Sequence, residues 1–237
     1  MVAPSAVDGC AAALRRQIVS GALQPGDRLP PERVLAVSLG VNRTTLRAAL
    51  GKLAAARLLH VRQGSGYVVR DYRRVAGLEL LPELAAVLQP NERAELVRDL
   101  LATRRQLAGL VFERIADRAS TSADVPVTAV RDAVQAFSDA VADGATLDEL
   151  AEADLAVTAA VLDASGSRAL ALCFNPVSVV VHGLPALRRQ MYADPEGNVR
   201  GYRMLLSWLA DPRRDALPML ERILAERDAA TVARLSA

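Results

Sequence analysis

The stretch from Leu29 to Arg70 constrains the fold more than any other part of this 237-residue chain. Near its start, Pro31 suits the first turn of a helix, because a missing backbone N–H costs nothing there. Gly40 is suited to end that helix in a left-handed conformation. Two residues later, Asn42 is a favourable N-cap for another helix. The pattern therefore predicts two short helices joined by a glycine-containing turn.

The second of these helices is predicted from about Arg43 to Ala55 and is amphipathic. Two short helices joined in this way form a helix-turn-helix, whose second helix enters the major groove of DNA. The polar residues Arg43, Thr44, Arg47 and Lys52 fall largely outside its apolar stripe. The stripe itself consists of Leu46, Ala49, Leu50 and Leu53.

The segment after this helix predicts a two-stranded wing. Short β-type runs over Leu58 to Arg62 and Tyr67 to Arg70 flank the sequence Gln63-Gly-Ser-Gly66. On its own, the charged face with Arg43 and Arg47 is equally typical of an ordinary solvated helix. The proline-rich lead-in and the glycine-rich wing at this distance favour DNA recognition instead.

These residues closely resemble the winged-helix domain of the GntR family of bacterial transcription regulators, from about Ala6 to Arg70. The resemblance implies that Arg43 and Arg47, in the first turns of the recognition helix, contact the operator. It also implies phosphate or flanking-base contacts from neighbouring residues and insertion of the wing tip into the adjacent groove. The residues expected to contact DNA are Arg33, Asn42, Arg43, Thr44, Thr45, Arg47, Gln63 and Gly64.

The distribution of charge supports nucleic acid as a partner. The chain has a net charge of +2, but residues 1–74 carry 12 basic and four acidic residues, whereas the remainder carries 17 basic and 23 acidic ones. The first part therefore has a charge of +8 and the second a charge of −6. A basic small domain beside an acidic larger one predicts that double-stranded DNA binds the first only.

From Leu78 onward the sequence predicts helices and no strands. The fold class is therefore mainly α, with an N-terminal winged helix-turn-helix and a C-terminal all-helical bundle of six or seven helices. The predicted domains are 1–70 for DNA binding, 71–77 as a linker and 78–237 for effector binding and dimerisation. The helical patterns cover about 78–89, 91–119, 126–143, 146–164, 167–191, 198–210 and 213–235.

The helical part resembles the effector domain of the fatty-acid-responsive FadR branch of the same family. The resemblance implies a homodimer that is released from DNA by a fatty acyl-CoA or fatty acid, although the C-terminal tail lacks the aromatic pattern of acyl-CoA-binding relatives. A small carboxylate is the alternative effector. The matching segments are Leu100-Leu-Ala-Thr-Arg104, Asp154-Leu155, Ala164-Ser-Gly166, Tyr192-Ala-Asp-Pro-Glu196 and Gly201-Tyr202.

Three polar residues in the helical part are candidates for ligand binding. Arg104 lies among leucines and would supply a cation for the polar end of the ligand, or else extend its guanidinium from the surface into water. Asn175 and Tyr202 are polar groups on otherwise apolar helices, which would either contact the ligand or be satisfied internally.

Many related effector domains bind a metal through an aspartate, a histidine four residues later and two further histidines. In this chain the position four residues after Asp154 is Thr158 and not a histidine. Tyr202 stands where another histidine is expected, and no histidine occurs near Leu224. The sequence therefore predicts no metal and no other cofactor. It also has no nucleophile–histidine pair and no phosphate-binding loop, so an enzyme with an accessory domain is the least favoured reading.

The remaining features predict a cytoplasmic protein with no membrane partner. Cys10 and Cys173 lie in different predicted domains and form no disulfide or metal-binding pattern. No apolar signal segment is present at the N-terminus. The apolar run from Leu170 to Leu187 is interrupted by polar residues and prolines, which is typical of a buried helix.

Overall fold

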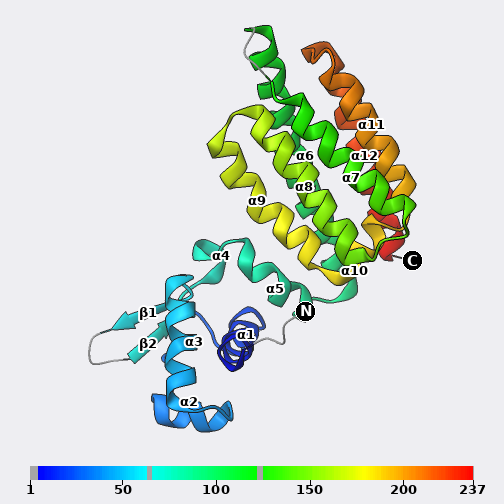
Figure 1. The fold of residues 1–237 in the computed structure, drawn as a ribbon. Helices are drawn as coiled ribbons and strands as arrows, with labels where there is room; N and C mark the ends of the chain where they lie inside the picture. Colours follow the sequence, from blue (N-terminus) through cyan, green and yellow to red (C-terminus); the bar gives the residue numbers. More distant parts are fainter. Residues whose placement is uncertain (1–4, 63–65, 122–124, 237) are drawn as a thin grey trace. The chain divides into compact units, whose positions relative to one another are not determined.

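The computed structural model describes residues 5–62, 66–121 and 125–236, and the chain forms two compact units. The first unit extends to Gln89 and the second begins at Pro90. Each unit has its own hydrophobic core. Figure 1 shows the small β-ribbon in the first and the long helices of the second.

The first unit begins with three helices: α1 (Ala6–Val19), α2 (Glu32–Ser38) and α3 (Arg43–Ala55). Gly40 ends α2 with a φ of 66°, the left-handed conformation expected from the sequence. The Asn42 side-chain oxygen accepts a hydrogen bond from the Thr45 backbone N–H at 2.8 Å and caps α3. The predicted helix-turn-helix is therefore confirmed.

A two-stranded antiparallel wing follows these helices. Strand β1 (Leu59–Arg62) pairs with β2 (Gly66–Val69), and Leu59 lies opposite Val69. An isolated bridge between Arg28 and Val68 ties the wing to the segment that precedes α2. The predicted wing is confirmed, while its tip lies outside the described residues.

The segment after the wing differs from the predicted linker at 71–77. It contains α4 (Tyr72–Val75), a 3₁₀ turn (Leu78–Leu80) and α5 (Leu81–Val87), and α5 packs against α1. Leu80 and Ala85 are buried, and Arg15 Nη1 contacts Glu83 Oε1 at 2.5 Å. The apolar residues of 78–89, which were expected from the sequence to lie in the bundle, are thus buried in the winged unit.

The second unit contains seven α-helices among its described residues, which confirms the predicted all-helical architecture. The predicted helix over 167–191 is two helices, because Leu184 leaves the helical conformation before Pro185 and the axis bends by 93°. The helices are α6 (Pro90–Ser120), α7 (Val127–Ala142), α8 (Leu147–Ser165), α9 (Arg168–Gly183), α10 (Pro185–Met191), α11 (Pro195–Leu209) and α12 (Leu217–Ser236), with a 3₁₀ turn at Arg214–Ala216.

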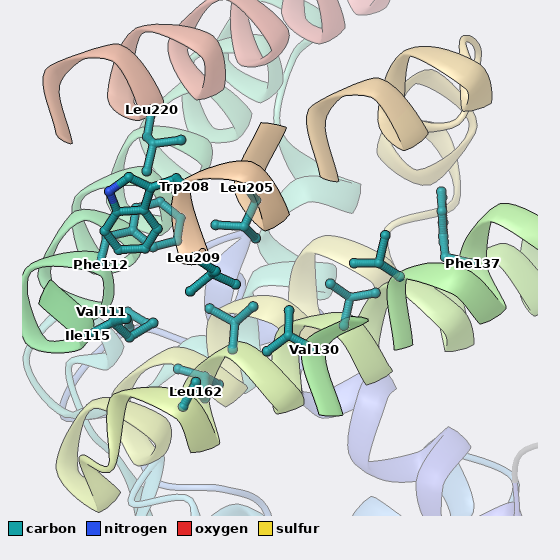
Figure 2. Packing of buried hydrophobic residues seen from close by; sticks show 14 of the residues in the cluster. Val111, Phe112, Ile115, Val130, Phe137, Leu162, Leu205, Trp208, Leu209 and Leu220 are labelled. Carbon is teal, nitrogen blue, oxygen red and sulfur yellow. The ribbon is translucent and has the colours of Figure 1, made fainter. Parts of the chain in front are cut away.

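The core of this bundle joins residues from helices far apart in the sequence. Phe112 of α6 meets Trp208 of α11 edge to face, with ring centroids 5.6 Å apart (Figure 2). Phe137 of α7 is fully buried and packs edge to face on Tyr202. Burying a large apolar side chain stabilises a fold by about 1.5–3 kcal/mol, so these contacts fix how α6, α7 and α11 are placed.

In the described part of the chain, no single helix is long and apolar enough to cross a bilayer. Only when α9 and α10 are taken together, across their bend, do they reach the length and apolar composition of such a helix.

Candidate functional site

The exposed face of α3 carries the residues that the sequence predicts to read DNA. Leu46 and Leu50 anchor the opposite face of α3 in the core, with 0% and 1% of their surface exposed. Arg43 and Arg47 are consequently directed to solvent. Arg47 Nε also donates to Glu32 Oε2 at 2.7 Å, so α2 orients this guanidinium.

The other predicted DNA contacts have different surroundings. Arg33 on α2 and Thr44 on α3 are exposed, whereas Thr45 is half-buried. The side-chain oxygen of Asn42 is occupied by the cap of α3. Gln63 and Gly64 lie outside the described residues.

Lys52 lies on the same helix but is engaged elsewhere. Its ammonium contacts Asp8 Oδ1 of α1 at 2.5 Å, and this hydrogen bond lowers the pKa of the Asp8 carboxyl from its ordinary value. The exposed arginines near the start of α3 therefore form the face best suited to DNA.

The second unit contains a cavity of about 150 Å³ lined by residues of α6, α8, α11 and α12, with Phe174 of α9. Most of its lining is aliphatic or aromatic, and Phe112, Leu162, Leu205 and Leu220 belong to the packed cluster in Figure 2. Its charged lining residues are Arg104, Arg105, Asp154, Arg227 and Asp228.

A buried hydrogen-bonded network lies at the polar part of this cavity. Asp154 of α8 accepts at Oδ1 from the Tyr202 hydroxyl and contacts His182 Nε2 through Oδ2 at 2.6 Å. His182 Nδ1 lies 2.7 Å from the Ser178 carbonyl oxygen. The side chains of Asp154 and His182 are only 6% and 5% exposed.

The geometry of this network fixes where its protons lie. A carbonyl oxygen only accepts, so His182 Nδ1 must carry a proton and donate to Ser178. One further proton then lies between His182 Nε2 and Asp154 Oδ2, on either atom. In both cases the pair has no net charge, which avoids the large cost of an isolated buried carboxylate.

The residues at the expected metal positions do line one cavity, but they do not fit a metal. Asp154 is joined there by Thr158, Tyr202 and Leu224, which offer two hydroxyls and a hydrocarbon side chain. Both carboxylate oxygens of Asp154 already have protein partners. Among the described residues, no group of three or more His, Cys, Asp or Glu side chains is placed to hold a metal ion.

Three arginines approach the same cavity from α6 and α12. Arg105 Nη1 contacts Asp228 Oδ2 at 2.5 Å and forms an ion pair with it. Arg104 lines the cavity without a hydrogen bond or ion pair to the described part of the protein. Arg227 donates through Nη1 to the Gly197 carbonyl oxygen.

Tyr192 supplies a further polar group to the lining. The residue is 5% exposed, and its hydroxyl has no hydrogen-bond partner among the described residues. Burial, reinforced by the charge of Asp154, raises the pKa of Tyr192 above its ordinary value. The phenol therefore stays protonated and is a donor inside the cavity, close to Asp154.

The structure brings two of the three predicted ligand residues together. Arg104 and Tyr202 both line the cavity, and Tyr202 is also satisfied internally by Asp154. Asn175 is exposed on α9 and does not line it. Sequence reasoning missed Arg227 and Tyr192, and only the glycines of α11 beside Arg227 offered a signal, since a helical glycine permits close approach of another group.

Comparisons with known proteins agree with this architecture. The model of the bacterial regulatory proteins of the gntR family matches residues 7–69. The HTH-type transcriptional regulator Mce2R of Mycobacterium tuberculosis is 45% identical over 43% of this chain, a match that spans only 42% of the relative. The fatty acid metabolism regulator protein of Edwardsiella ictaluri is 33% identical over 78% of this chain and 70% of the relative.

A solved structure has the same overall fold. Lar, which controls expression of the Listeria monocytogenes agr system, superposes with a TM-score of 0.62 and 15% identity, covering 99% of this chain and 98% of Lar. The winged helix-turn-helix places the chain among the helix-turn-helix proteins. It belongs to the GntR family of bacterial regulatory proteins, a family of transcription regulators.

Proposed function

We propose that this chain forms a homodimer that binds a pseudo-palindromic operator and is released from it by a fatty acid or fatty acyl-CoA. The winged unit would read DNA, and the helical unit would bind the effector and join the two subunits. A two-fold dimer imposes two-fold symmetry on its binding site, which is why the operator should be pseudo-palindromic. The proposal also assigns the protein to the cytoplasm.

The DNA-reading part of the proposal rests on the exposed start of α3. Arg43 and Arg47 are exposed on a helix whose other face is buried in the core, so both side chains extend from a fixed stretch of backbone. An arginine bidentate to guanine contributes about 1–3 kcal/mol of discrimination between bases. Arg33, Thr44 and Thr45 are proposed to contact phosphates or flanking bases, and Gln63 with Gly64 the adjacent groove.

The observation that carries the effector proposal is the amphiphilic cavity of the helical unit. Arg104 lines it without a hydrogen-bonded carboxylate among the described residues, while the aliphatic groups of Val157, Leu205 and Leu220 line it elsewhere. A molecule with an acidic head and a hydrocarbon tail matches both parts. The relative from Edwardsiella ictaluri, named as a fatty acid metabolism regulator, supports the same assignment.

The size of the cavity favours a second candidate, a small carboxylate. A volume of about 150 Å³ is below the roughly 300–1,000 Å³ of a typical ligand pocket. A short organic acid fits such a space directly, whereas a long acyl chain requires the surrounding helices to move apart. The two candidates share the arginine-bound acidic group and differ in the length of the tail.

Operator binding titrated with acids of increasing length tests the proposal. Each buried methylene contributes about 0.8 kcal/mol, so the concentration needed to release DNA should fall with each added carbon until the cavity is full. The series would consist of fatty acids and acyl-CoAs with about four to sixteen carbons in the acyl chain. Succinate and lactate would be tested beside them at the same salt concentration. Release by the short acids alone would overturn the lipid effector and support the alternative.

A further inference from the structure

We infer that Arg227 and the Tyr192 hydroxyl join Arg104 in one anion-binding position in the cavity, so that α6 and α12 together hold an ionised acid group. This inference rests on the proposed effector function and deepens it. The ligand chemistry it selects is a free carboxylate or phosphate at this end of the cavity, in place of a neutral thioester or alcohol.

The balance of charge in the cavity lining supports an anion. Three arginines face two aspartates there. Asp228 is paired with Arg105, and Asp154 shares a proton with His182. The guanidinium groups of Arg104 and Arg227 are consequently left without a carboxylate within hydrogen-bonding distance in the described part of the chain.

Arg227 is held in place by the shape of α11. Gly197 and Gly201 lie one turn apart on this helix, and Arg227 donates to the carbonyl of Gly197. A Cβ on Gly201 would lie 3.1 Å from Arg227 Nη1, closer than ordinary packing permits. Gly201 and the carbonyl group of Gly197 therefore form a seat in which the guanidinium rests against the helix backbone at the edge of the cavity.

This seat holds a cation in a place where positive charge is unfavourable. Burial lowers the pKa of the Arg227 guanidinium, and the charge of Arg104 lowers it further, while Asp154 and Asp194 oppose the shift. Asp194 is used elsewhere, since it caps α11 through the Gly197 N–H and contacts Arg200. An anion bound between the two arginines would relieve their repulsion.

Tyr192 adds a neutral donor to the same position. Its hydroxyl is buried and makes no geometric hydrogen bond to the part of the chain that the structure describes, and a buried unsatisfied polar group costs about 1–3 kcal/mol. Arg104, Arg227 and Tyr192 line the same cavity, so one bound ligand can meet all three. A ligand oxygen that accepts from this phenol removes the cost.

A matched set of eight-carbon probes separates recognition of the head group from recognition of the tail. Octanoate, octyl phosphate, octanoyl-CoA and octanol share a similar tail, and succinate tests the short-acid alternative. Binding of each probe to full-length protein would be measured by calorimetry, together with probe-induced release of operator DNA. The variants are Arg227→Met, which keeps the stem but removes the charge, Arg227→Lys and Tyr192→Phe.

Arg222 provides the control, because it lies on the same helix with its side chain 72% exposed and can be changed in the same way. We expect Arg227→Met to weaken octanoate or octyl phosphate by at least about tenfold, the effect of a 1.4 kcal/mol loss. Octanol binding should not change. Arg227→Lys should restore part of the affinity, Tyr192→Phe should cause a smaller loss, and Arg222→Met should behave as the wild type.

Two results would overturn the inference while leaving the effector function intact. One is octanoate binding and DNA release that are unaffected by Arg227→Met. The other is an equal loss of octanoate and octanol, which would show that Arg227 only maintains the packing. If the wild-type protein binds none of the probes, both the inference and the proposed effector are overturned. If succinate binds and its binding depends on Arg227, the anion site is supported with the shorter ligand.

Discussion

The winged unit and the helical bundle use arginine in opposite ways. Arg43 and Arg47 stand exposed on one short helix, close together in sequence and supported by ordinary capping and core residues. Arg104 and Arg227 come from helices more than a hundred residues apart and are partly withdrawn from water. Exposed arginines suit a large polyanion such as DNA, which binds at the surface. Partly buried arginines suit a small acid, which loses its bound water when it enters the cavity.

This contrast has an energetic consequence. Exposed charges cost the fold little, so the DNA-reading face can be changed without unfolding the winged unit. Beside the cavity, the buried groups of Asp154, His182 and Tyr202 are satisfied by one another, so a change in this network alters stability together with binding. The variants that follow test this difference, beginning with the largest expected effect.

Phe137→Ala should destabilise the bundle and leave the winged unit folded. Phe137 is fully buried between Tyr192 and Tyr202, and a buried Phe→Ala change costs about 3–5 kcal/mol. Hydrogen exchange measured during thermal unfolding should show that only the backbone amides after Pro90 lose protection. Equal loss of protection in α1 and α3 would contradict the separation into two units.

Asp154→Ala should destabilise the bundle nearly as much. The change removes the partner of the buried His182 and the acceptor of Tyr202, and breaking a buried pair costs about 3–5 kcal/mol. Asp8→Ala, which breaks the exposed contact with Lys52, is the matched change in the winged unit and should leave unfolding almost unchanged. Chemical denaturation of both variants would check the comparison, and similar stability losses would refute it.

Arg43→Ala and Arg47→Ala should each reduce the preference for operator over scrambled DNA by about 1–3 kcal/mol. Both side chains are exposed, so the melting temperature should stay close to that of the wild type. Competition binding at matched salt measures the preference directly. If both variants retain full specificity, α3 is not the recognition helix.

The smallest effect compares the N-caps of the two units. Asn42 caps α3 and Thr146 caps α8, and replacing such a residue by Ala costs about 1 kcal/mol. Only Asn42→Ala should also weaken operator binding, because α3 is the helix proposed to contact DNA. Equal effects of the two changes on DNA binding would contradict this assignment.

The Thr146 cap also predicts a dependence on pH. Hydrogen bonds from the Thr146 backbone N–H and hydroxyl lower the pKa of Glu149 from its ordinary value of 4.5. Its contribution to stability is therefore present above that value and is lost as the pH falls through the lower folded-state pKa. The cost of Thr146→Ala should accordingly be greatest near neutral pH and shrink under acid conditions.

The winged unit was largely predictable because its information is local. Gly40 and Asn42 act through the backbone of neighbouring residues, and the structure places both as predicted. Pro31 lies one position earlier than predicted, at the N-cap of α2 and not in its first turn. The end of this unit was not predictable, since the amphipathic pattern at 78–89 does not show which core will bury it. Packing of α5 against α1 decided that outcome.

The cavity was only partly predictable because its residues meet through tertiary packing. Arg104 was identified by its apolar neighbours in sequence, and the structure places it in the lining. Arg227 resembles the other charged residues of α12 until the glycines of α11 are seen beside it. Asn175 carried the same sequence signal as Tyr202, yet its position on α9 turns it to solvent.

One measurement tests most directly whether the two arginine sets have separate functions. Operator affinity and its response to octanoate would be measured by fluorescence anisotropy for the wild type, Arg47→Ala and Arg104→Met, with octanoate binding measured by calorimetry. Arg47→Ala should lose operator specificity and bind octanoate normally, whereas Arg104→Met should bind operator normally and require at least about tenfold more octanoate for release. Loss of both properties in either variant, or unchanged release in Arg104→Met, would contradict the proposed division.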